Sequence, residues 1–255
     1  LWPNSQLSTA DGTAPDCAGI TPRRRGVRMA SMADPAAPNY SDAEDDDECE
    51  GVAYMFDAAA ATERRSLALD HGAVYYYCLA DDDAAATHHI SGHSAWPAAI
   101  TLARRIAERW TPVNSALELG CGCGIVGLTC ASLGCPRVAF SDRDGGALDL
   151  ARRGVAANGF EGCTFDRRAW GAVDHGERFA LVVGSDLIYD PGVVEPLVTT
   201  AAASLAPGGR FVLAQSFALG DASSRALDEA CGAHKLALEV VESAGEARVW
   251  EIRGL

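Results

Sequence analysis

The stretch that decides the fold of this chain is Leu117–Gly124, which reads LELGCGCG. Its first residues belong to a predicted strand, Ala116–Leu119, and its glycines lead into a predicted helix, Ile125–Leu133. Glycine allows the backbone to turn tightly and to approach a ligand that a Cβ atom would block. A glycine-rich turn between a strand and a helix therefore predicts a ligand site at the carboxyl edge of an open α/β sheet.

The same alternation of strand and helix continues on both sides of this turn. It predicts an α/β fold: a Rossmann-like, seven-stranded, mostly parallel sheet with helices on both faces and a C-terminal antiparallel β-hairpin. The other predicted strands are Arg137–Ser141, Cys163–Phe165, Phe179–Gly184, Phe211–Ala214, Leu236–Val241 and Ala247–Ile252, the last two joined around Gly245. The other predicted helices are Pro97–Trp110, Ala147–Ala157, Val193–Leu205 and Ser223–Cys231, with the stop of the third expected at Pro207-Gly208-Gly209.

Charge divides the chain into parts. The net charge of the 255 residues is −14, and a dense acidic run spans Asp42 to Glu50. We expect residues 1–50 to form a disordered acidic tail, because such a run repels itself, although a docking site for a basic partner is the alternative. Residues 51–90 are predicted to be an extension with short strands, one of them Val74–Leu79, and residues 91–255 to be the catalytic domain.

Composition excludes several classes of protein. No apolar run reaches the roughly 20 residues of a membrane span, and the acidic balance disfavours binding to nucleic acid. Nine cysteines without a framework spacing, and no visible secretory signal, favour reduced thiols in the cytoplasm, with the nucleus as the alternative. We expect no metal site, because Cys121 and Cys123 lack partners at zinc spacing, and His88, His89 and His93 are expected to face solvent.

The residues around the glycines favour one cofactor, S-adenosyl-L-methionine. Asp142 ends the next strand, where a carboxylate can accept hydrogen bonds from both ribose hydroxyls. The series Gly122, Gly124 and Gly127 also fits a dinucleotide fingerprint, so the glycines alone do not decide. Glu118 would repel a pyrophosphate but suits the amino-acid end of S-adenosylmethionine, and no second domain follows for a hydride acceptor. A nicotinamide or flavin site and a turn without a ligand remain alternatives.

Four segments carry a resemblance to a known family. They are residues 91–99 (SGHSAWPAA), the glycine loop with Asp142, residues 168–171 (RAWG) and residues 184–191 (GSDLIYDP). Together they resemble the class I, seven-β-strand S-adenosylmethionine-dependent methyltransferases. More narrowly, they are similar to the family-16 group of protein-lysine methyltransferases, which also includes nicotinamide-methyltransferase-like relatives.

The resemblance implies roles for individual residues. It places Asp142 at the ribose and Trp170 near the adenine, and makes Asp186 and Tyr189 the catalytic residues that border the acceptor pocket. The alternative for Asp186 is a helix-cap or turn residue, and for the tryptophans it is ordinary packing. The full set of implied cofactor-binding residues is Trp96, Glu118, Gly120, Cys121, Gly122, Gly124, Asp142, Trp170 and Ser185.

The predicted function follows from these roles. We expect an N-methyltransferase that acts on a lysine side chain of a protein substrate with a basic acceptor segment, and we expect the enzyme to be a monomer. A lysine must be neutral to attack, and its unperturbed pKa is about 10.4, so Asp186 is expected to accept a hydrogen bond from the amine and orient its lone pair. A small-molecule amine (nicotinamide-like) N-methyltransferase, a non-catalytic cofactor-binding interaction module and an NAD-linked oxidoreductase are the alternatives. The group often has an Arg after the fifth strand, where this chain has Ala214-Gln215-Ser216-Phe217.

Overall fold

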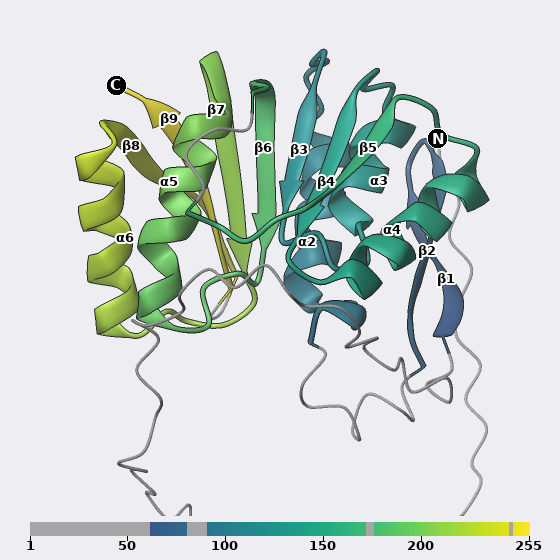
Figure 1. The fold of residues 1–255 in the computed structure, drawn as a ribbon, viewed down its shortest axis with the longest axis horizontal. Helices are drawn as coiled ribbons and strands as arrows, with labels where there is room; N and C mark the ends of the chain where they lie inside the picture. The colour runs from purple at the N-terminus through teal and green to yellow at the C-terminus, as the bar shows by residue number, and fades with distance from the viewer. Residues whose placement is uncertain (1–61, 81–90, 172–175, 245–246) are drawn as a thin grey trace, which may run out of the picture. The chain divides into compact units, whose positions relative to one another are not determined.

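A seven-stranded sheet forms the centre of the protein. The computed structural model describes residues 62–80, 91–171, 176–244 and 247–255. The strand order is β5-β4-β3-β6-β7-β9-β8, which runs from right to left in Figure 1. The strands are β3 (Ala116–Leu119), β4 (Val138–Asp142), β5 (Cys163–Arg167), β6 (Phe179–Ser185), β7 (Leu205–Gln215), β8 (Leu236–Ala244) and β9 (Ala247–Gly254).

Strands β3 to β7 pair in parallel, and β9 pairs antiparallel with both β7 and β8. The chain moves outward from β3 through β4 to β5 and then returns to place β6 on the other side of β3. Ligands of open α/β sheets bind where the strand order reverses in this way, outside the carboxyl ends of the strands. The predicted fold class is confirmed, including the antiparallel C-terminal hairpin.

Helices cover both faces of the sheet because the central strands are apolar on both sides. In β3, Ala116 joins the core beneath α2 (Pro97–Glu108), α3 (Ile125–Ser132) and α4 (Gly145–Asn158). Leu117 and Leu119 join the second core, beneath α5 (Val194–Ser204) and α6 (Asp221–Ala233). Alternate residues of a strand point to opposite faces, so a fully buried strand of this kind needs helices on both.

A separate two-stranded hairpin, β1 (Thr62–Leu69) and β2 (Gly72–Leu79), packs mainly against α4. Asn158, at the end of α4, accepts from the backbone N–H of Tyr75 at 2.9 Å and donates to the carbonyl of Tyr75 at 2.6 Å. The side-chain amide thus pairs with β2 as a neighbouring strand would. The sequence predicted Val74–Leu79 within β2 but did not place β1.

Most predicted elements differ from the observed ones by a few residues at their ends, and the largest difference is at the start of β7. Helix α5 ends at Ser204, and β7 begins at the next residue, so Pro207-Gly208-Gly209 lies inside β7 instead of between the helix and a later strand. The pairing of β6 with β7 shifts there, from Phe179 opposite Leu205 to Leu181 opposite Arg210. The Pro-Gly-Gly segment is therefore an irregularity in a strand, which Pro and Gly often mark.

Several predictions fall outside the described residues. These are the acidic tail of residues 1–50, the start of the extension at residues 51–61, and the turn around Gly245. Within the described ranges, no helix is both long and apolar enough to cross a bilayer.

Candidate functional site

The glycine loop, residues 120–124, joins β3 to α3 at the carboxyl edge of the sheet. Its glycines have left-handed backbone angles, with φ of +55° at Gly120, +49° at Gly122 and +73° at Gly124. Gly122 is also confined, because a Cβ atom there would lie 2.7 Å from the carbonyl oxygen of Gly92. Side chains other than hydrogen rarely tolerate either condition. The predicted tight turn between strand and helix is confirmed.

Glu118 lies behind this loop and not on its open surface. Its side chain is 2% exposed, and its carboxylate accepts hydrogen bonds from the backbone N–H groups of Gly127 at 2.8 Å and Val126 at 3.3 Å. These are two of the N–H groups that the first turn of a helix leaves without partners. Burial raises the pKa of Glu118 to about 8, although the two donors lower it. Glu118 therefore caps α3, which sequence reasoning did not foresee, and its contact with a cofactor stays a prediction.

Asp142 lies at the end of β4, beside the loop. One carboxylate oxygen accepts from the N–H of Gly122 and the other from the N–H of Asp144, both at 3.0 Å. Burial raises the pKa of Asp142, and the two backbone donors lower it. A carboxylate offers about four acceptor sites, so two remain for an incoming ligand. The pair of adjacent ribose hydroxyls that the sequence assigned to Asp142 matches this number.

His93 is buried against the same network, so the prediction that it faces solvent is wrong. It ends the short 3₁₀ turn η1 (Ser91–His93) and is 6% exposed. Its Nε2 atom lies 2.7 Å from a carboxylate oxygen of Asp144, the N-cap residue of α4. The neighbours of His93 in the sequence are polar, which suggested exposure, and the partner that it bonds lies 51 positions away. His88 and His89 lie outside the described residues.

The two tryptophans that the sequence assigned to the cofactor lie in different surroundings. Trp170 packs on the core beneath α5 and α6, and its ring lies 3.1 Å from where a Cβ atom of Gly120 would be. It therefore borders the glycine loop. Trp96 directly precedes α2 and is 42% exposed. The structure brings Trp170 to the loop, and contact of either ring with a cofactor stays a prediction.

Cys121 and Ser185 complete the predicted cofactor set. Cys121 is buried, and its backbone N–H donates to the carbonyl of Ser141 in β4 at 3.0 Å. Ser185 is half-buried at the end of β6. The cysteines in the described part of the chain are free thiols, and no three His, Cys, Asp or Glu side chains gather there as a metal site requires.

Asp186 begins the loop that follows β6 and holds three elements together. Its carboxylate accepts from the N–H of Ala98 in α2 at 3.1 Å, and from the N–H and hydroxyl of Ser216 at 2.7 and 2.8 Å. Its backbone is left-handed, with φ of +54°, an uncommon conformation for a residue with a side chain. Such strain persists where the surroundings fix the backbone, often at functional sites.

Residues at the carboxyl end of β7 and directly after it hold this loop, and sequence reasoning missed their role. The side chain of Gln215 is buried; its amide oxygen accepts from the N–H of Ile188 at 3.1 Å and its nitrogen donates to the Ile188 carbonyl at 3.2 Å. The only sequence signal for Gln215 was that the similar family often has an Arg in this stretch, where this chain has none. Tyr189, the next residue along the loop, is 62% exposed.

The loop after β6 and the glycine loop touch through Leu187. A Cβ atom on Gly120 would lie 2.6 Å from a methyl group of Leu187. Asp142, Trp170 and Asp186 therefore share one edge of the sheet with the glycine loop.

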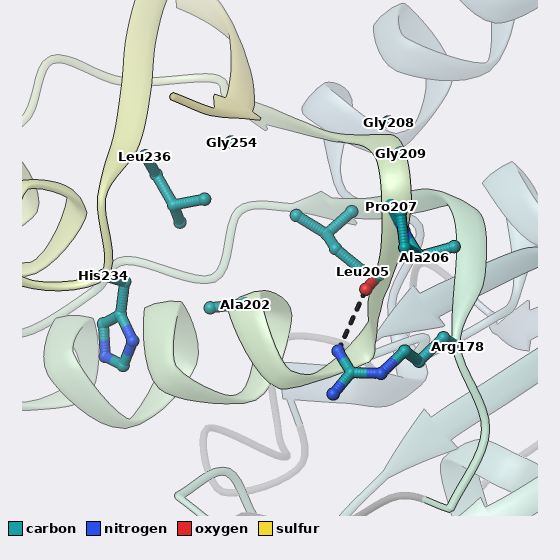
Figure 2. Close-up of a pocket in the computed structure, with 10 residues that line it drawn as sticks. All are labelled: Arg178, Ala202, Leu205, Ala206, Pro207, Gly208, Gly209, His234, Leu236 and Gly254. Carbon is teal, nitrogen blue, oxygen red and sulfur yellow. Dashed lines mark hydrogen bonds between the residues drawn. The ribbon is translucent and has the colours of Figure 1, made fainter.

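Two cavities lie at opposite ends of strand β7. One, of about 310 Å³, lies at the edge where β7 begins (Figure 2). Its polar side chains are engaged: Arg178 donates to the carbonyls of Ala203 and Leu205, and His234 bonds Thr199. The other, of about 130 Å³, lies among the start of α2, the end of β7 and the β8–β9 hairpin. Ala98 and Ser216, both donors to Asp186, line it.

The sequence model of the lysine methyltransferase family matches residues 84–216, just over half of the chain. The chain belongs to this family. The matched region contains η1, the glycine loop, Asp142 and the loop after β6, and it ends at Ser216, a partner of Asp186. The chain is thus a methyltransferase that uses S-adenosyl-L-methionine.

Solved structures share the fold of this methyltransferase. The 16S rRNA N2 G1207 methyltransferase RsmC of Thermus thermophilus, in complex with AdoMet and guanosine, has a TM-score of 0.57 and 21% identity over 76% of this chain. The chain spans about half of that protein (51%). The ribosomal protein L11 methylase of Lactobacillus delbrueckii subsp. bulgaricus has a TM-score of 0.50 and 18% identity over 62% of this chain and 77% of its own.

A third similar structure is the glycopeptide N-methyltransferase MtfA, with a TM-score of 0.50 and 18% identity over 61% of this chain and 90% of its own. It has also been crystallised with S-adenosyl-L-methionine and with sinefungin. No curated protein sequence matches the chain. The named acceptors of these structures include RNA, protein and glycopeptide, so their shared fold does not identify the acceptor of this methyltransferase.

Proposed function

We propose that the chain methylates the nitrogen of a lysine side chain in a protein substrate. Membership of the lysine methyltransferase family supports this proposal. The observation that carries it is the Asp186 loop: its carboxylate is fixed by α2 and Ser216, and Leu187 of the same loop packs on Gly120 of the glycine loop. An acceptor bound at Asp186 would lie next to the cofactor loop.

The size of the small cavity lined by Ala98 and Ser216, the two residues that donate to Asp186, supports a slender acceptor. Its volume of about 130 Å³ is below the roughly 300 Å³ at which pockets for small molecules begin. A lysine side chain can enter such a space as a single aliphatic arm while the rest of its protein stays outside. A nicotinamide-like amine would need to be enclosed, and no observation on the described residues favours that alternative.

In this proposal the chain's own residues hold, orient and dehydrate the reactants. Asp142 holds the ribose with its two remaining acceptor sites, and Trp170 borders the adenine. S-adenosyl-L-methionine would supply a methyl group on a sulfonium: as the N–C bond forms, the C–S bond would break and the neutral thioether would leave, so alignment is the main task of the protein.

The acceptor amine must be neutral when it attacks. Asp186 accepts a hydrogen bond from an amine N–H and thereby directs the nitrogen lone pair. Partial burial beside a sulfonium cation disfavours the ammonium form of the amine. The exposed ring of Tyr189 forms the outer wall of the channel and contacts the substrate.

The test is methyl transfer from S-adenosylmethionine with a labelled methyl group to proteins of a cell extract. The wild type should label protein, and hydrolysis should recover the label as methyllysine. Asp186→Asn should abolish the label. Asp190→Asn is the matched control: Asp190 lies on the same loop and caps η2 (Pro191–Val193) through Gly192, and Asn caps equally well.

Other distributions of the label would contradict lysine methylation. Label found only in small molecules would identify a small-molecule amine N-methyltransferase. Label in RNA, or on residues of protein other than lysine, would also reject the proposal. A chain that binds the cofactor and labels nothing would be an interaction module.

A further inference from the structure

The turn η1 packs directly on the glycine loop, although it comes from upstream of α2. The carbonyl of Gly92 fills the space that a side chain at Gly122 would need. The thiol of Cys123 also lies 3.4 Å from the carbonyl oxygen of His93. The loop is therefore held from outside the strand–turn–helix unit that forms it.

From η1 a chain of hydrogen bonds leads to Asp142. The Nε2 atom of His93 donates to one oxygen of the Asp144 carboxylate at 2.7 Å, and the N–H of Gly146 donates to the other at 2.9 Å. Both oxygens of Asp144 are thus engaged, which restrains its side chain at the start of α4. The N–H of Asp144 then donates to Asp142 at 3.0 Å.

This arrangement determines which acceptor sites of Asp142 stay open. The N–H of Asp144 holds one oxygen and the N–H of Gly122 holds the other, so the plane of the carboxylate is set by two backbone groups. A shift of Asp144 would release one oxygen and rotate the remaining acceptor sites. In metal sites, groups that orient a ligating side chain from behind commonly contribute about tenfold or more to affinity, and the same logic applies to a carboxylate that orients hydroxyls.

We propose that His93 is a positioning residue of the cofactor site, which acts through Asp144 to orient the Asp142 carboxylate toward the two ribose hydroxyls. This inference rests on the part of the proposed function that places the ribose at Asp142. It does not depend on the acceptor, because it concerns binding and not transfer.

The test compares two ligands that differ in one ribose hydroxyl, S-adenosylhomocysteine and its 2′-deoxy analogue, by calorimetric titration of the full chain. The wild type should prefer the ribose form by about tenfold or more, since a lost hydrogen bond to a charged group is worth about 1.5–3 kcal/mol. His93→Ala should reduce this preference at least threefold. If His93 served stability alone, its loss would weaken the binding of both ligands equally and leave the preference for the ribose form unchanged.

Further variants separate positioning from folding. His93→Gln should restore the preference, because the amide of Gln places a donor near the Nε2 position. Asp144→Ser keeps a good N-cap for α4 but removes the acceptor of His93, and should reduce the preference as His93→Ala does. The double variant should be no worse than either single one, as expected for residues of one network. His71→Ala is the control, since His71 is exposed and bonds Ser132.

An unchanged preference in both His93→Ala and Asp144→Ser would overturn the inference, as would a wild type that binds both ligands alike. In either case methyl transfer by the wild type would still be measurable. Failure of this inference is therefore distinguishable from failure of the proposed methyltransferase activity.

Discussion

The glycine loop and the loop after β6 lie at the same edge of the sheet but are built differently. In the first, glycines supply the left-handed angles, and the acids Glu118 and Asp142 receive backbone N–H groups from within the loop and α3. In the second, the left-handed residue is Asp186, which carries a side chain, and the residues that hold it come from α2 and the end of β7.

The exposure of the two loops also differs. Cys121 and Cys123 of the glycine loop are buried, whereas Tyr189 of the second loop points largely into solvent. The cofactor side is thus largely buried, and its two acids are held by backbone N–H groups of neighbouring turns and helices, while η1 packs on the loop from outside the strand–turn–helix unit. On the other side, residues distant in the sequence hold the Asp186 carboxylate, and the ring of Tyr189 is exposed. This division predicts that substitutions in each loop affect different steps.

Within the glycine loop, the largest effect is expected for Gly122→Ala. The new Cβ atom would lie 2.7 Å from the Gly92 carbonyl at a φ of +49°, so the loop must distort. S-adenosylmethionine affinity, measured by calorimetry, should fall by more than about tenfold, the effect of roughly 1.4 kcal/mol. Gly134→Ala is the matched control: its φ is +86°, but nothing lies within 4 Å of the new atom. It should lose stability of about 1 kcal/mol and keep the affinity. Equal affinities in the two variants would refute the close fit of η1 on the loop.

A smaller effect, on turnover alone, is expected for Gln215→Leu. The substitution leaves the buried N–H and carbonyl of Ile188 without their partner, at a cost of about 1–3 kcal/mol for each group. The Asp186 loop should loosen, and kcat should fall about tenfold, while cofactor affinity stays within about twofold. Steady-state kinetics together with titration measure this. Weaker cofactor binding with an unchanged kcat would show that the two loops do not act on separate steps.

The smallest effect concerns pH. Burial raises the pKa of Glu118 from 4.5 to about 8, so the folded chain binds a proton there that the unfolded chain releases. The contribution of this group to stability is therefore present in full below about pH 4.5 and is lost as pH rises through 8. Urea unfolding at pH 6 and pH 8.5 should show the wild type losing stability relative to Glu118→Gln. Because the other titrating groups are common to both proteins, parallel pH profiles would contradict the burial of this carboxyl.

The sequence predicted those parts of the fold that local patterns specify. Apolar runs and the turn at residues 120–124 placed the strands and helices of the core, and Asp142 was located by its position after a strand. The strand β1 was not predicted because Glu63 and Arg65 are half-buried on the face where a strand pattern would have apolar residues. The Pro-Gly-Gly irregularity in β7 was taken for a boundary because those residues also end helices.

The parts of the site that sequence did not predict depend on contacts between distant residues. His93 bonds Asp144 across 51 positions, and Gln215 bonds Ile188 across 27. Such polar contacts have no period along the chain, so neither the burial of His93 nor the bridging by Gln215 could be derived from spacing. Glu118 was recognised as part of the site, but its partners, the first N–H groups of α3, appear only in three dimensions.

The central claim is that cofactor binding and methyl transfer are divided between Asp142 and Asp186. Its most direct test measures both S-adenosylmethionine affinity and transfer to protein for Asp142→Ala and Asp186→Asn. We expect Asp142→Ala to weaken binding about tenfold or more. Asp186→Asn should leave binding within about twofold while transfer falls about 100-fold, the effect of an acceptor displaced by about 1 Å from its aligned position. Loss of cofactor binding in Asp186→Asn as severe as in Asp142→Ala would contradict the claim and make Asp186 a structural residue.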